Sequence, residues 1–166
     1  MELHFIATCL ILNKVAVGCN RKGFQVKKLD IEFLVYEGEH FEVEFYFDEN
    51  EDIVIWNDFL ALSDKEQASF LARVEKLADS PPGTIHPKTI FNLEDDKDKI
   101  WAIKFGNNRF CSFFYEGGKI IITNAYKKQS QKNRKKENTQ IKKASKFKLD
   151  YEKRAKKNDY YPEDKD

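Results

Sequence analysis

Long apolar runs are absent from this chain of 166 residues. A membrane-spanning helix needs roughly 18 or more consecutive apolar residues, and the only candidate region, near the N-terminus, is interrupted by Lys14 and Lys22. The same region lacks the basic segment that opens a cleaved signal peptide. We therefore expect neither a membrane partner nor a cleaved signal.

Cysteine and the common catalytic motifs are equally scarce. The three cysteines, Cys9, Cys19 and Cys111, have neither the spacing of a disulfide framework nor that of a CxxC site, and their odd number favours a reducing compartment. The sequence contains no HExxH, GxxxxGK[ST] or GxSxG motif. We predict a cytoplasmic protein without a metal or another cofactor.

What is present is a core-forming composition and an uneven distribution of charge. Hydrophobic residues make up 41% of the chain and include 14 phenylalanines, which is enough for one globular domain. The net charge is only +1, but 14 of the 29 lysines and arginines fall within residues 127–157, against 3 of the 28 acidic residues. Such a split predicts a surface that faces nucleic acid; the alternative is a solvated helix that keeps the protein soluble.

The apolar pattern predicts a strand followed by two helices. Residues 41–47, FEVEFYF, alternate apolar and polar side chains, which is the pattern of a strand with one buried face. Residues 53–62 suit a short helix, and Ser63 with Glu66 form a capping box that opens a second one, which ends at a Pro-Pro-Gly sequence. We expect residues 84–99 to form a long polar loop.

Three antiparallel strands are predicted at residues 100–105, 109–115 and 119–126. Gly117 and Gly118 predict a two-residue turn between the last two strands, because such a turn needs positive φ at both positions. The pairs that follow are Tyr115 with Ile120, Phe113 with Ile122, Cys111 with Asn124 and Arg109 with Tyr126. Paired residues share one face of the sheet.

The preceding connection decides the face on which Lys104 lies. A two-residue loop at residues 107–108 places Lys104 opposite Cys111, on the face of Arg109 and Tyr126, whereas a three-residue loop would place it on the other face. The other face is expected to be the core side against the helices, with Trp101, Ile103, Phe105, Phe110 and Phe114.

The lysine-rich C-terminal part predicts a basic amphipathic helix, because apolar residues recur there at steps of three or four. These residues are Ile141, Ala144, Phe147, Tyr151 and Ala155. The predicted fold class is α+β, with a small antiparallel sheet (strand, two helices, three strands) and a basic C-terminal helix. We divide the chain into an N-terminal extension of unknown role at 1–40, a domain at 41–157, and an acidic, disordered tail at 158–166.

The order of these elements, with the segments FEVEFY, IWAIKF, RFCSFFYEGGKIIITNAY and KQSQKNR, resembles the RelE/ParE toxin superfamily, specifically the phage-derived HigB-like branch of type II toxin-antitoxin systems. The resemblance covers residues 41–157. It implies a RelE-like fold and the activity of a toxin that is a metal-independent endoribonuclease, or mRNA interferase, acting on translated mRNA at the ribosome. It also implies a cognate antitoxin, usually a small helix-turn-helix DNA-binding protein.

The resemblance also assigns roles to basic residues. The family's strand arginine corresponds to Arg109, and the basic residue of the preceding strand corresponds to Lys104. Lys128 and Lys132 match the basic residues that follow the last strand. The catalytic set implied is Arg109, Lys104 and Lys128, and the RNA-binding set is Tyr126, Lys132, Ser130, Gln131, Arg134 and Lys88.

A cationic site of this kind can cut RNA when the 2′-OH of the RNA attacks the adjacent phosphate, because the charge of the phosphorane then needs cationic donors. The three histidines do not form the pair that many ribonucleases use. We expect Arg109 to stabilise the phosphorane, Lys104 to position or activate the reacting atoms, and Lys128 with Lys132 to hold phosphates or protonate the leaving group. Tyr126 would stack on a base.

Two departures from the family keep other functions open. Residues 94–98 are mostly acidic where the family often has a basic loop, and Arg134 stands where a proline is common. The alternatives are a ParE-like gyrase inhibitor and a degenerate toxin that acts as a non-catalytic binding protein. Lys104, Arg109 and Tyr126 would then be an ordinary solvent-facing patch.

Overall fold

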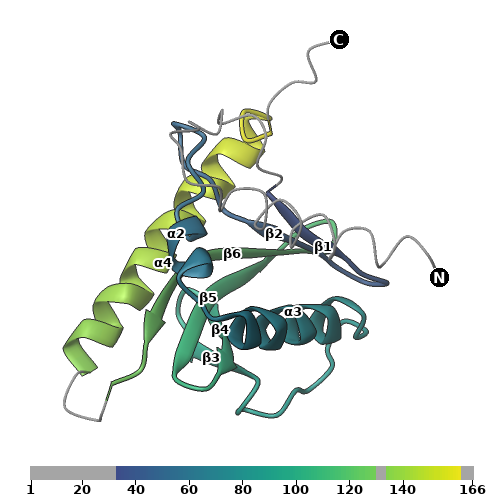
Figure 1. The fold of residues 1–166 in the computed structure, drawn as a ribbon. Coiled ribbons are helices and arrows are strands. Elements are labelled where there is room, and N and C mark those ends of the chain that lie inside the picture. The colour runs from purple at the N-terminus through teal and green to yellow at the C-terminus, as the bar shows by residue number, and fades with distance from the viewer. Residues whose placement is uncertain (1–32, 130–133, 162–166) are drawn as a thin grey trace, which may run out of the picture.

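The computed structural model describes residues 33–129 and 134–161 (Figure 1). These residues form one six-stranded sheet with the strand order β1-β2-β6-β5-β4-β3, in which β2 is parallel to β6 and the other neighbours are antiparallel. The strands are β1 Leu34–Glu37, β2 Glu42–Phe45, β3 Phe91–Asp95, β4 Ile100–Phe105, β5 Asn108–Tyr115 and β6 Lys119–Lys127. The helices are α2 Trp56–Leu60, α3 Asp64–Ala78 and α4 Arg134–Lys156.

The predicted α+β class is confirmed, but the sheet is larger than expected and mixed rather than antiparallel. β1 lies inside the segment predicted as an extension and pairs with β2. β3 lies inside residues 84–99, so the prediction of a continuous loop there was wrong. β3 is an edge strand in which only Phe91 is buried, and such a strand shows no clear alternation of apolar and polar residues.

The two predicted helices after β2 are confirmed. Ser63 accepts a hydrogen bond from the backbone N–H of Glu66, and the Glu66 carboxylate accepts one from the backbone N–H of Ser63, which completes the predicted capping box at the start of α3. One stripe of α3 packs on the sheet: the ring of Phe70 lies 4.8 Å from that of Phe110 and 5.9 Å from that of Phe105. The predicted core face of the sheet therefore lies under α2 and α3, except that Phe114, which was expected in the core, is 41% exposed.

The second face of the sheet is also buried, because α4 lies across it on the side opposite α3 (Figure 1). The predicted apolar stripe of this basic helix supplies the contacts, with Ala144 and Tyr151 buried and Ile141 and Phe147 packed beside them. The expectation that β2 has a single buried face was therefore wrong. Glu44, on the side expected to meet solvent, is only 2% exposed.

Arg154 fastens the C-terminal part of α4 to the chain segment that follows β2. Its Nε donates to Asp150 at 2.9 Å, its Nη2 donates to the carbonyl oxygen of Phe47, and its guanidinium lies 4.5 Å from the ring centre of Tyr160. Asp150 also accepts a 2.6 Å hydrogen bond from the hydroxyl of Tyr46. An ion pair, hydrogen bonds and ring packing thus fix the C-terminal part of α4 against the segment that follows β2.

The chain stays packed for a few residues beyond α4, within the segment predicted as a disordered tail. Tyr160 is 2% exposed, and its hydroxyl accepts a 2.9 Å hydrogen bond from the backbone N–H of Phe47. The hydroxyl of Tyr161 donates to Glu44 at 2.8 Å. The acidic composition of this segment led to the prediction of disorder, but Tyr160 and Tyr161 pack against the domain.

The β5–β6 connection has three residues instead of two. Tyr115 pairs with Lys119, and Gly117 and Gly118 both have positive φ, 77° and 75°. The register is one residue away from the prediction as far as Ser112 opposite Ile122, so the expected pairs of Tyr115 with Ile120 and Phe113 with Ile122 were wrong. A bulge beyond Phe110 then restores the predicted register.

The bulge brings Arg109 opposite Tyr126, as predicted, whereas Cys111 lies at the bulge and not opposite Asn124. In the preceding hairpin Phe105 pairs with Asn108, so the loop is residues 106–107. Lys104 therefore lies opposite Arg109 and not opposite Cys111. The predicted face of Lys104 is still correct, because the register differs by an even number of residues.

Lys119 is the ion-pair partner of the buried Glu44 carboxylate. Its ammonium donates to Glu44 and, at 2.7 Å, to Glu42. We predict that Lys119→Met lowers the free energy of unfolding by about 2–3 kcal/mol. This decrease lies below the ~3–5 kcal/mol for breaking a fully buried pair, because Tyr161 still donates to Glu44. Urea denaturation measures the decrease.

The matched control is Lys65→Met, because Lys65 is exposed on α3. We expect its effect to stay within about 0.5 kcal/mol. Equal destabilisation in the two variants would contradict a stabilising role for the Lys119 pair.

Candidate nucleic-acid interface

Three predicted site residues lie side by side at one end of the sheet. Lys104 on β4 is opposite Arg109 on β5, and Arg109 is opposite Tyr126 on β6. Directly opposed side chains have Cβ atoms about 4.5–5.5 Å apart, so the three form a continuous row on the face that α4 covers elsewhere. We call this set the cationic row.

Arg109 is held in place by backbone and keeps donors to spare. Its Nη1 donates to the carbonyl oxygens of Gly106 and Asn108, both at 2.9 Å. Within residues 33–129 and 134–161 no carboxylate forms an ion pair with it. A guanidinium has five N–H donors, so Nε and Nη2 remain for an anionic ligand such as a phosphate.

Lys104 has an acidic partner on the neighbouring strand. Its Nζ lies 2.9 Å from Oε1 of Glu94 on β3, and the two side chains are 15% and 21% exposed. The acidic segment 94–98 thus places one carboxylate beside the row, where it neutralises Lys104. The sequence did not reveal this pair, because β3 was predicted as loop.

Tyr126 is half-buried, and its hydroxyl stays protonated at neutral pH. Burial raises its pKa most, and the neighbouring Cys111, Glu94 and Glu137 raise it further, while Arg109 acts in the opposite direction. The hydroxyl can therefore donate a hydrogen bond, and the ring offers an aromatic face for stacking.

Exposed basic residues extend the cationic row beyond the end of β6. The backbone N–H of Lys128 donates to the carbonyl oxygen of Asn107 at 2.8 Å, which holds this segment against the β4–β5 turn. Lys127, opposite Asn108, is exposed, as are Lys128 and Arg134, the first residue of α4. The predicted RNA-binding residues Ser130, Gln131 and Lys132 lie outside the described residues.

Lys88 lies before β3 and is exposed. The backbone N–H of Lys104 donates to the carbonyl oxygen of Ile90 at 2.7 Å, so the start of β3 lies beside the end of β4. Lys88 is thus at the same end of the sheet as the row, although no contact joins its side chain to Lys104 or Arg109.

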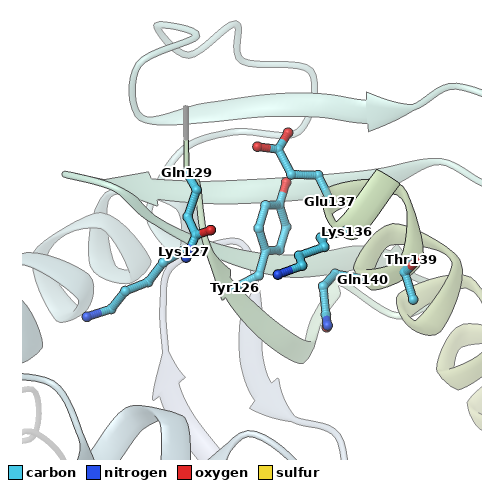
Figure 2. A pocket seen from close by; sticks show the side chains of 7 residues that line it. All are labelled: Tyr126, Lys127, Gln129, Lys136, Glu137, Thr139 and Gln140. Atoms are coloured by element: carbon cyan, nitrogen blue, oxygen red, sulfur yellow. The ribbon is translucent and has the colours of Figure 1, made fainter. Parts of the chain in front are cut away.

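A pocket of about 270 Å³ lies between the end of β6 and the first turns of α4. Figure 2 shows its lining, with Tyr126 on β6 facing residues of α4. The lining residues are Tyr126, Lys127, Gln129, Lys136, Glu137, Thr139 and Gln140. Of these the sequence had singled out only Tyr126. The sequence did contain a sign for two of the other lining residues, Glu137 and Gln140. They are three residues apart in a predicted helix and therefore lie on one face of it.

The chemistry of this end of the sheet is cationic and aromatic. Burial raises the pKa of the Cys111 thiol to about 12, so it is not a nucleophile at neutral pH. Among residues 33–129 and 134–161 no three His, Cys, Asp or Glu side chains form a group that could hold a metal ion. In the same part of the chain no helix has the length and apolar character needed to cross a membrane.

A comparison with protein families identifies a family that this chain matches. The family model described as "Phage derived protein Gp49-like (DUF891)" matches residues 57–146. This range runs from α2 into α4 and contains the cationic row and the pocket. Comparison with curated protein sequences gives no match.

The exposed lysines at the start of α4 test whether this surface attracts nucleic acid. We predict that replacing Lys135, Lys136, Lys142 and Lys143 by Gln weakens binding of single-stranded RNA. The dependence of log K on log salt should flatten by about 0.7 for each phosphate that the variant no longer neutralises, because fewer counterions are released. Fluorescence anisotropy at several salt concentrations measures both effects.

A control with the same change in net charge replaces four exposed lysines outside residues 127–157, which are Lys65, Lys76, Lys97 and Lys99. We expect this control to retain most of the affinity. If the two quadruple variants bind equally, the basic segment serves only solubility.

Proposed function

We propose that this chain is the toxin of a type II toxin-antitoxin system. The chain belongs to the phage-derived Gp49-like family, which is a RelE-like family of toxins. Its activity is that of a metal-independent endoribonuclease that cuts translated mRNA at the ribosome in the cytoplasm. The RelE-like fold, the HigB-like branch and a small helix-turn-helix antitoxin are parts of the same proposal.

The observation that carries the proposal is the cationic row. Arg109 is anchored by two carbonyl oxygens and retains two donor groups, and it lies between a lysine and a tyrosine on adjacent strands. A fixed guanidinium suits a phosphorane, because its donors are already oriented before charge develops. The aromatic ring beside it can hold a base of the same RNA strand.

The reaction needs no metal, because the RNA supplies its own nucleophile. The 2′-oxygen forms a bond to phosphorus and loses its proton to solvent, and the bond from phosphorus to the 5′-oxygen breaks. Arg109 stabilises the charge of the phosphorane, Lys104 positions the reacting phosphate, and Lys128 protonates the leaving 5′-oxygen. The products are a 2′,3′-cyclic phosphate and a free 5′-OH.

A second candidate function, a non-catalytic binding protein, is favoured by the pair of Lys104 and Glu94. A carboxylate 2.9 Å from the lysine lowers the positive potential that a phosphate would meet. A toxin that had lost catalysis could retain such a pair, and it would bind RNA without cutting it.

Arg109→Ala tests the catalytic proposal. We predict that this variant no longer arrests growth and cuts mRNA at least about 100-fold more slowly, as after the removal of one donor to a transition-state anion. Arg109→Lys should recover little of the rate, because an ammonium cannot replace the planar fork.

The control is Arg73→Ala, which removes a half-buried arginine of α3. It should keep the wild-type rate. Wild-type cleavage by Arg109→Ala would remove the catalytic assignment, and trapped gyrase-DNA complexes with intact mRNA would establish a ParE-like activity.

Glu94→Gln separates the two candidate functions. It removes the negative charge beside Lys104 and leaves a side chain of the same shape, so we predict a several-fold tighter affinity for single-stranded RNA and faster cleavage. Binding and single-turnover cleavage assays measure the two effects. Tighter binding with no cleavage in either protein would support the non-catalytic function.

A further inference from the structure

The turn between β4 and β5 supplies the anchor of Arg109 and is itself exposed. Nη1 of Arg109 donates to the carbonyl oxygens of Gly106 and Asn108, which flank Asn107 in the sequence. Gly106 has a positive φ of 55°, and both Gly106 and Asn107 are exposed. Exposed turns move more than the strands that they join. The position of the guanidinium therefore depends on the contacts that hold this turn.

The turn is held from two directions. The backbone N–H of Lys128, just beyond β6, donates to the carbonyl oxygen of Asn107 at 2.8 Å. On the face that α3 covers, Nδ2 of Asn108 donates to Oε1 of Glu66 at 3.0 Å. Asn108 is 6% exposed, and Glu66 lies 42 residues away in the first turn of α3. Because successive residues of a strand point to opposite faces, this second contact ties the backbone beside Arg109 to a helix on the other side of the sheet.

The capping box of α3 does not account for the contact between Glu66 and Asn108. The cap uses the other carboxylate oxygen: Oε2 of Glu66 accepts from the backbone N–H of Ser63 at 2.9 Å and from its hydroxyl at 3.0 Å. Hydrogen bonds from the Ser63 backbone, then from Asn108, lower the pKa of Glu66, so the carboxylate is ionised at neutral pH. A hydrogen bond to an ionised acceptor is roughly twice as strong as one between neutral groups.

We propose that Asn108 and Glu66 position the guanidinium of Arg109. Glu66 fixes the side chain of Asn108, and the carbonyl oxygen of the same asparagine accepts the hydrogen bond from Nη1 of Arg109. A shift of the turn would move this carbonyl oxygen and that of Gly106, and with them the Nε and Nη2 groups that stabilise the phosphorane. Asn108 and Glu66 act through Arg109 and do not contact the RNA. This inference rests on the proposed function, which assigns the phosphorane to Arg109.

Asn108→Ala removes the donor to Glu66 and leaves the capping box intact. We expect the maximal single-turnover rate of mRNA cleavage on translating ribosomes to fall about tenfold, because a misplacement of about 1 Å can cost about 100-fold. The protein concentration that gives half of this rate should change by less than about twofold, because the basic residues that attract the RNA are unchanged. Rates measured over a range of protein concentrations give both quantities.

Asn108→Asp separates the hydrogen bond from the shape of the side chain. Aspartate has nearly the shape of asparagine, but when ionised it has no donor for Glu66, and its charge repels that carboxylate. We expect a maximal rate at least as low as that of Asn108→Ala. A wild-type maximal rate in Asn108→Asp would overturn the positioning role.

The Arg109→Ala background distinguishes positioning from a general loosening of the fold. In this background we expect Asn108→Ala to change the residual rate by less than about twofold, because the group that it positions is absent. A loosened fold would slow cleavage whether or not the arginine is present. Equal fold losses in the two backgrounds would therefore overturn the positioning role.

The matched control is Tyr36→Phe, which also removes a side-chain hydrogen bond between the sheet and α3. The hydroxyl of Tyr36 on β1 donates at 3.2 Å to Asp79, the C-cap at the opposite end of α3. This variant should keep the wild-type maximal rate. A wild-type maximal rate in Asn108→Ala would overturn the positioning role and leave the proposed function intact. The absence of cleavage by the wild-type protein would contradict the proposed function and overturn both proposals.

Discussion

The packing of α4 across the second face of the sheet is the contact on which the rest of the structure depends. Tyr151 and Ala144 supply its apolar part, and the contacts of Arg154 with Asp150 and with the Phe47 carbonyl oxygen fix its position. With α3 on the other side, both faces of the sheet are closed. The end where β4, β5 and β6 meet the first turns of α4 stays accessible, and it carries the cationic row and the pocket.

The same packing divides the basic residues of α4 into two groups. Toward the C-terminus two of them are engaged in packing: Arg154 lies over the Tyr160 ring, and Nζ of Lys148 donates to the Asp98 carbonyl oxygen at 2.8 Å. Lys153 and Lys156 are exposed. At the N-terminus Arg134, Lys135 and Lys136 are exposed beside the row. A charge run that is uniform in the sequence therefore serves two purposes: two of its residues fix the helix, and the others remain exposed.

Acidic residues limit this positive surface at defined points. Glu94 neutralises Lys104, and the Glu66 carboxylate accepts a 3.0 Å hydrogen bond from the Asn108 side chain at the start of β5. Hydrogen bonds from the Ser63 backbone, then from Asn108, lower the pKa of Glu66, which keeps it ionised. Each face of this end of the sheet thus carries one carboxylate among its basic residues: Glu94 on the side of α4 and Glu66 on the side of α3.

Local signals in the sequence were sufficient for much of the fold. The capping box of Ser63 and Glu66, the stripe of α4 and the pair of Arg109 with Tyr126 all followed from short-range patterns. The pair was predicted correctly through two errors that cancel, because the longer turn and the bulge shift the register in opposite directions. A bulge leaves no distinct pattern in a strand that is buried on both faces.

Short-range patterns could not predict contacts between segments that are far apart in the sequence. Glu94 could not be placed beside Lys104 without knowing that β3 joins the edge of the sheet. The burial of Glu44 depends on Lys119 and Tyr161, which are 75 and 117 residues away along the chain. Such residues look like ordinary surface charges until the tertiary structure brings their partners together.

The chemistry of the cleaved ends tests the central claim most directly. Purified wild-type protein incubated with translating ribosomes should leave mRNA fragments that end in a 2′,3′-cyclic phosphate and begin with a 5′-OH, because the nucleophile is the 2′-oxygen of the RNA. Fragments with 3′-OH and 5′-phosphate ends, or mRNA that remains intact, would contradict the account.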